Sequence, residues 1–81
     1  TRQVLIVERD PKLAAGLRRS LERRGFDVAT ASGIVDGFAL LRNLLPSVLM
    51  ANVESGLIDG PGLCRVVRGT PGFRKLPVFL Y

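Results

Sequence analysis

The sequence predicts an α/β protein built on a doubly wound parallel sheet. Short apolar runs alternate along the chain with longer segments in which apolar residues recur every three or four positions. The apolar runs are continuous rather than alternating with polar residues, which is typical of strands covered on both faces. The predicted order is β-α-β-α-β-α-β, and this alternation favours parallel strands with right-handed crossovers and helices on both faces.

The first strand and helix are marked by an apolar run and a helix start. Residues 3–7, QVLIV, predict the strand. Asp10 and Pro11 follow, and they favour a helix start because the carboxylate can cap free amides while proline fits the first helical position. The helix is expected to run to about Arg24, with Gly25 as its stop. Its inward-facing residues are expected to be Leu13, Ala14, Leu17 and Leu21.

The middle of the chain repeats this pattern. Residues 26–32 predict a second strand, residues 33–45 a second helix that Pro46 ends, and residues 47–53, SVLMANV, a third strand. The inward-facing positions of this helix are expected to be Ile34, Phe38, Leu41 and Leu45.

The last third adds a loop, a helix and a strand. The loop GLIDGP leads into a helix that opens at Gly60 and Pro61 and runs to about Arg68, with Leu63, Val66 and Val67 expected to face inward. A connector rich in turn formers precedes PVFLY, residues 77–81, the fourth predicted strand. Because a bare apolar strand needs a further covering helix, we interpret 1–81 as a single domain that is incomplete at its C-terminal end.

The amino-acid composition excludes several classes of protein and of functional site. The 81 residues fit one small domain, and 47% of them are apolar, yet no apolar run reaches the length of about 20 residues that spans a bilayer. Nothing at the start resembles a signal peptide, so a cytoplasmic protein without membrane insertion is expected. The lone Cys64 excludes an internal disulfide and is expected to be packed and inert, and the lack of histidine removes zinc-type clusters and histidine acid–base catalysis.

Basic residues outnumber acidic ones by twelve to seven, and ten of the twelve are arginine. Four arginines are predicted to lie close together on the first helix, where they are candidates for binding an acidic protein surface or phosphates: Arg18, Arg19, Arg23 and Arg24. A solvated helix face is the alternative. No aromatic residue is interleaved with them to stack bases, so nucleic-acid binding is not favoured.

In a doubly wound sheet the functional site lies at the carboxyl ends of the central strands, where the strand order reverses. The loops ERDP and NVESGLIDG follow the first and third strands. We therefore expect these two loops to be neighbours in space.

Four segments in sequence order resemble the receiver domain of bacterial two-component response regulators: VLIVERDPKLAAGLRRSLERRGFDV, DGFALLRNLLPSVLMANV, IDGPGLCRVVRGTP and LPVFLY. The resemblance implies a flavodoxin-like fold of which the chain holds the first four strands and three helices. It also implies phosphoryl transfer from a histidine kinase to an aspartate at the end of the third strand, with Mg²⁺ held by an acid pair after the first strand.

By position, Glu8 and Arg9 stand where the family has its pair of acids, and Asn52 stands where the family has its phosphoacceptor aspartate. An amide is a far poorer nucleophile than a carboxylate. A guanidinium repels a cation, and Arg9 is expected to fill the metal position by pairing with Glu8, Asp10 or Asn52. No catalytic residue, metal or cofactor is therefore predicted, and Mg²⁺ is expected only if the site is functional after all. Asp10 is explained better as the helix cap than as a replacement ligand.

The loop after the third strand departs from the family pattern as well. Gly56 stands near the family's usual proline, and Glu54 places a bulky acid on the rim. Glu54 and Asp59 are together candidates for holding a cation, although Asp59 before Gly60 is explained more simply as a turn residue.

These departures favour a pseudo-receiver: a module, not an enzyme, that regulates by binding a protein partner or an output domain in the same chain, without being phosphorylated. The binding partner can also be a second copy of the chain, in a homodimer. One alternative is a genuine phosphoacceptor in which Asn52 is natural or engineered. The other is an anion-binding or nucleic-acid-binding regulator that uses the arginines of the first helix.

Overall fold

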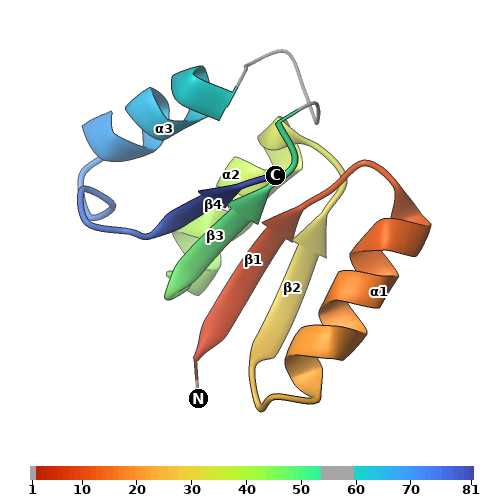
Figure 1. The fold of residues 1–81 in the computed structure, drawn as a ribbon. Helices are drawn as coiled ribbons and strands as arrows, with labels where there is room; N and C mark the ends of the chain where they lie inside the picture. The colour runs from red at the N-terminus through yellow and green to blue at the C-terminus, as the bar shows by residue number, and fades with distance from the viewer. Residues whose placement is uncertain (1, 54–59) are drawn as a thin grey trace.

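The computed structural model describes residues 2–53 and 60–81, and its elements follow the predicted order (Figure 1). The strands are β1 Gln3–Val7, β2 Asp27–Ala31, β3 Val48–Ala51 and β4 Val78–Leu80. The helices are α1 Pro11–Glu22, α2 Ile34–Leu44 and α3 Gly60–Gly69. All strand pairs are parallel and the order is β2-β1-β3-β4, so the strand order reverses between β1 and β3.

The sheet carries an apolar core on each face, because successive strand residues point to opposite sides. Val4 and Ile6 of β1 belong to a cluster that Leu17 and Leu21 of α1 cover. A second, larger cluster on the other face holds two residues of β1 together with residues of β3, α2, α3 and the connector before β4: Leu5, Val7, Leu41, Leu49, Ala51, Leu63, Val67, Phe73 and Leu76. Figure 1 shows α1 in front of the sheet and α2 behind it, which is the predicted doubly wound arrangement.

Both ends of α1 are closed by local hydrogen bonds. The Asp10 carboxylate accepts a hydrogen bond of 2.9 Å from the Lys12 N–H, so Asp10 caps the helix as predicted. At the other end Gly25 adopts a φ of 91°, and its N–H donates to the Glu22 carbonyl. The Phe26 N–H donates to the Leu21 carbonyl, which completes a Schellman motif. The regular helix runs to Glu22 with Arg23 as its C-cap residue, so its end agrees with the predicted end at about Arg24 and the predicted stop at Gly25.

Three residues that were predicted to face inward are exposed. Leu13, Leu45 and Val66 expose 43%, 69% and 42% of their surface. A helix contacts a flat sheet along a narrow band, and Leu13 and Val66 lie at the edges of their apolar stripes. Leu45 follows the last residue of α2 in the left-handed conformation, with φ 49°, so it has left the helix face altogether. Within the described part of the chain, no helix is both long and apolar enough to cross a membrane.

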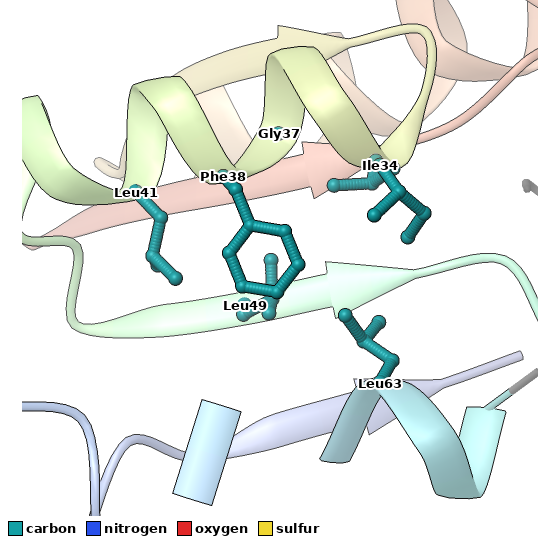
Figure 2. Close-up of a pocket in the computed structure, with 7 residues that line it drawn as sticks. Ile34, Gly37, Phe38, Leu41, Leu49 and Leu63 are labelled. Carbon is teal, nitrogen blue, oxygen red and sulfur yellow. The ribbon is translucent and has the colours of Figure 1, made fainter. Parts of the chain in front are cut away.

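Gly37 sets the distance between α2 and β1. A Cβ at this position would lie 2.8 Å from Cγ2 of Val7, well inside contact distance. Next to this contact, α2, β1, β3 and α3 enclose an apolar cavity of about 10 Å³, and Figure 2 shows the side chains of Phe38, Leu49 and Leu63 around it. The cavity is too small and too apolar for a ligand, so this region serves packing.

We predict opposite effects of adding a methyl group at two helical glycines. Gly37→Ala is expected to lower the free energy of unfolding by about 1–3 kcal/mol, because the new methyl group pushes α2 away from Val7. Gly16→Ala in α1 meets no atom within 4 Å and is expected to raise it by about 1 kcal/mol through helix propensity. Urea unfolding measures both, and equal stabilisation by the two changes would contradict the close packing of α2 on β1.

Candidate functional site

Three side chains meet at the carboxyl edge of the sheet. Glu8, Asn52 and Tyr81 each come directly after the last residue of β1, β3 and β4. The backbone ladder continues through them, since the Asn52 N–H donates to the Val7 carbonyl at 3.0 Å and the Tyr81 N–H donates to the Ala51 carbonyl at 3.1 Å. Parallel strands end at one edge, so residues far apart in sequence are brought together there.

Glu8 is the centre of this group. Its residue surface is only 4% exposed. One carboxylate oxygen, Oε2, accepts a hydrogen bond of 2.9 Å from the Asp10 N–H. The other, Oε1, accepts from Nδ2 of Asn52 at 3.0 Å and from the hydroxyl of Tyr81 at 2.9 Å. Three uncharged donors therefore satisfy a buried negative charge that would be costly if it were left unpaired.

The same hydrogen bonds control ionisation at the site. Burial alone raises the pKa of Glu8, but the hydrogen bonds from the Asp10 N–H and from the Asn52 and Tyr81 side chains act against it, and the pKa of Glu8 ends below its usual value. Burial, the hydrogen bond to Glu8 and the negative charge of Glu8 all raise the pKa of Tyr81. At neutral pH Glu8 is therefore an ionised acceptor and Tyr81 a protonated donor.

The prediction that Arg9 fills the metal position is wrong. Arg9 is exposed, and the ion pair found among the described residues joins Nε of Arg18 to Glu22 at 3.3 Å instead. A guanidinium would have to lose its hydration to reach the Glu8 carboxylate. Asn52 and Tyr81 supply neutral donors without that cost, so Glu8 needs no cation to be stable.

The other predicted site residues take different positions. Asp10 contributes its backbone N–H to Glu8 and uses its carboxylate to cap α1. Glu54, Gly56 and Asp59 lie outside the described residues. Cys64 is a free thiol, half-buried on α3.

Of the four arginines predicted for the first helix, two lie on α1 and two lie at its C-terminal end. Arg18 and Arg19 lie on α1, whereas Arg23 and Arg24 lie beyond its last residue, in the turn that leads to Gly25. All four are exposed. Arg23 is the C-cap residue of α1, with right-handed helical angles, and its N–H donates to the Arg19 carbonyl, so the chain turns away only at Gly25, after Arg24. A binding role for these arginines stays a prediction.

Sequence reasoning missed Tyr81 as a site residue. It assigned PVFLY to a strand and placed the site on the loops after the first and third strands. The available signal was that a fourth parallel strand next to β3 must end at the same edge of the sheet as Glu8 and Asn52.

The side chains present do not fit a Mg²⁺ site of the kind that the resemblance implies. Mg²⁺ prefers several oxygen ligands in octahedral geometry. Here both oxygens of Glu8 accept hydrogen bonds, Asn52 turns its Nδ2 group towards Glu8, and Arg9 has no oxygen in its side chain. Among residues 2–53 and 60–81, no group of three or more acidic, cysteine or histidine side chains is arranged to hold a metal ion. We therefore derive no phosphoryl-transfer step at this site.

Curated relatives of the chain are response regulators, although no family model matches the sequence. The chain is 38% identical over 77 residues to the transcriptional regulatory protein AfsQ1 of Streptomyces coelicolor, covering 95% of this chain and 33% of the relative. It is 32% identical over 68 residues to the response regulator MprA of Mycobacterium tuberculosis, covering 84% of this chain and 30% of the relative. The chain thus spans about a third of the length of these relatives.

Solved structures agree with these relatives. The signal receiver domain of a histidine kinase from Syntrophus aciditrophicus has a TM-score of 0.90 and 30% identity, with 99% of this chain and 61% of that chain covered. The chemotaxis response regulator CheY4 of Vibrio cholerae has a TM-score of 0.91, with 99% of this chain and 67% of that chain covered, and at 19% identity it supports the flavodoxin-like fold alone. The sequence relatives and the shared fold together show that the chain belongs to the receiver domains of response regulators in two-component signalling.

Proposed function

We propose that this domain is a pseudo-receiver, which regulates by binding a protein partner and is not phosphorylated. The observation that carries the proposal is the closed hydrogen-bond group around Glu8. Both oxygens of its carboxylate accept hydrogen bonds, from the Asp10 N–H, the Asn52 amide and the Tyr81 hydroxyl. A receiver that worked by phosphorylation would need this carboxylate to hold the cation that neutralises the transferred phosphoryl group.

The chemistry of Asn52 supports the same proposal. A carboxylate attacks phosphorus with a charged oxygen, whereas the oxygen of an amide is neutral and its nitrogen lone pair is delocalised. Nδ2 of Asn52 also stabilises Glu8 directly. The residue at the acceptor position therefore has a structural task here, as a donor to a buried acid.

The partner is proposed to be protein, either an output domain in the same chain or a separate protein, and the setting cytoplasmic. AfsQ1 is described as a transcriptional regulatory protein and RpaA of Synechocystis, which is 28% identical to this chain, as a DNA-binding transcriptional regulator. By analogy, binding of this domain would control a DNA-binding output. The domain itself is not proposed to contact nucleic acid.

Phosphorylation tests the proposal most directly. After incubation with acetyl phosphate and Mg²⁺, the intact mass of the protein is expected to show no phosphate adduct, because Asn52 cannot accept the group. An adduct that peptide mapping places on the loop of Asn52 would reject the pseudo-receiver and favour the genuine phosphoacceptor. A matched positive control is Arg9→Asp combined with Asn52→Asp, which puts back the carboxylates that the family uses at these positions.

A single substitution, Asn52→Asp, is expected to make the stability of the protein depend on Mg²⁺. Asn52→Asp removes the Nδ2 donor and places a second carboxylate where a 3.0 Å hydrogen bond to Glu8 existed. We expect the free energy of unfolding to fall by about 2 kcal/mol, because a hydrogen bond is replaced by repulsion between like charges in a buried site. Millimolar Mg²⁺ is expected to recover part of this loss in the variant and to leave the unchanged protein unaffected.

Asn43→Asp is the matched control for that experiment. Asn43 is exposed on α2, so the same chemical change there is expected to alter the free energy of unfolding by no more than about 0.5 kcal/mol and to give no response to Mg²⁺. Stabilisation of the unchanged protein by millimolar Mg²⁺ would show that the Glu8 site still binds the ion.

The lowered pKa of Glu8 predicts a loss of stability in acid. A carboxyl group whose pKa is lower in the folded than in the unfolded state stabilises the fold above its unfolded pKa, and this contribution disappears as the pH falls through the folded pKa. The difference in unfolding free energy between the unchanged protein and Glu8→Gln should therefore be larger at about pH 7 than at about pH 3. Urea unfolding at both pH values measures it, and an equal difference at both would contradict the hydrogen-bonded carboxylate.

A further inference from the structure

A second cavity opens beside the same edge of the sheet, on the side of β2. It lies between the start of α1 and the carboxyl end of β2 and has a volume of about 280 Å³. Figure 1 shows α1 and β2 side by side. We call this cavity the α1–β2 cavity. Its lining includes Arg9 and Arg18 together with Thr30 and Ser32. The fold thus brings together two arginines that the sequence had suggested for separate roles.

The lining of the α1–β2 cavity favours an anion. Glu8 is the one acid among the described residues that line it, and both oxygens of that carboxylate already accept hydrogen bonds from within the fold. Arg9 is exposed and lies outside the ion pair found among the described residues. Arg18 pairs with Glu22 through Nε, but both side chains are about half exposed, and such surface pairs are weak and easily exchanged for another anion.

The nearest other carboxylate also has a partner within the fold. Asp10 lies between Arg9 and Pro11 in the sequence, and its carboxylate accepts a hydrogen bond from the Lys12 N–H at the start of α1. The lining therefore holds two guanidinium groups against the single carboxylate of Glu8, which leaves it with a net positive charge.

The size and the remaining lining restrict the kind of anion. About 280 Å³ is just below the usual range for drug-sized ligands, which is roughly 300–1,000 Å³. The other lining residues are small or apolar, including Ala14 and Ala15, and no aromatic residue among those described lines the cavity for a base to stack on. A guanidinium group can donate two parallel hydrogen bonds to two oxygens of one phosphate group. The hydroxyl groups of Thr30 and Ser32 can donate to further oxygens.

We propose that the α1–β2 cavity binds the phosphate group of a small molecule, with Arg9 and Arg18 as its main recognition residues. This site differs from the position that a phosphoryl group would take at Asn52, on the β3 side of β1. It requires neither Mg²⁺ nor a phosphoacceptor, so it does not depend on the proposed function. A bound phosphate group would contact both Arg9 in the loop after β1 and Arg18 on α1, and so hold these two segments together. Binding of a small metabolite would then restrict the movement of the segment next to Glu8.

Titration of the protein with inorganic phosphate, followed by amide signals in ¹H–¹⁵N spectra at constant ionic strength, tests the proposal. We expect saturable shifts at Ala15 and Ser32. Arg9→Gln and Arg18→Gln are each expected to weaken binding about tenfold, since each removes charge-assisted hydrogen bonds to the anion. Arg42→Gln is the matched control, because Arg42 is an exposed arginine on α2, outside this cavity, and it should change binding less than about twofold.

Each contrary outcome rejects the proposal. Shifts that grow without saturation, or that weaken equally in Arg42→Gln, would show non-specific attraction to a basic protein. Absence of any shift at these amides would show that the cavity takes no phosphate. A phosphoserine peptide that binds at least tenfold more tightly than inorganic phosphate, with shifts extending along exposed α1, would instead identify a protein ligand.

Discussion

The burial of the Glu8 carboxylate is the constraint on which the functional edge of this domain depends. The residue is almost inaccessible to water, and a carboxylate in such a position must be hydrogen-bonded or paired with a cation. In this chain the partners are a backbone N–H, the amide of Asn52 and the hydroxyl of Tyr81. These donors come from three different parts of the chain, so the hydrogen bonds also tie the ends of β1, β3 and β4 together.

The two-sided packing of the sheet is what holds those strand ends in place. The clusters on the two faces bury the last four residues of β1, and Gly37 allows α2 to lie close against Val7, the last residue of that strand. Glu8 follows Val7 directly, so the packing of α2 fixes the position of the backbone from which the Glu8 side chain extends. A central strand of this kind leaves little freedom at its end, which suits a site that depends on hydrogen-bond distances near 3 Å.

Membership of the receiver family and the proposed loss of the family's metal chemistry are compatible in physical terms. The fold needs the apolar strands, the helix starts and the close contact at Gly37, and these survive without any particular residue at the acceptor position. The chemistry needs several carboxylates around a cation. When Asn52 and Arg9 stand at two of these positions, the remaining acid can be stabilised by neutral donors, and the edge of the sheet keeps its shape.

The sequence alone determined the order of the elements, the parallel doubly wound sheet and the cap at Asp10, because these follow from local periodicity and from the chemistry of helix ends. It also determined that Glu8 and Asn52 would be neighbours, since parallel strands share one carboxyl edge. Only the tertiary structure decided that Tyr81, not Arg9, completes the site and that Arg9 joins Arg18 in another cavity. The reason is that partner choice at a buried charge depends on three-dimensional distance and desolvation, which the spacing of residues along a chain does not encode.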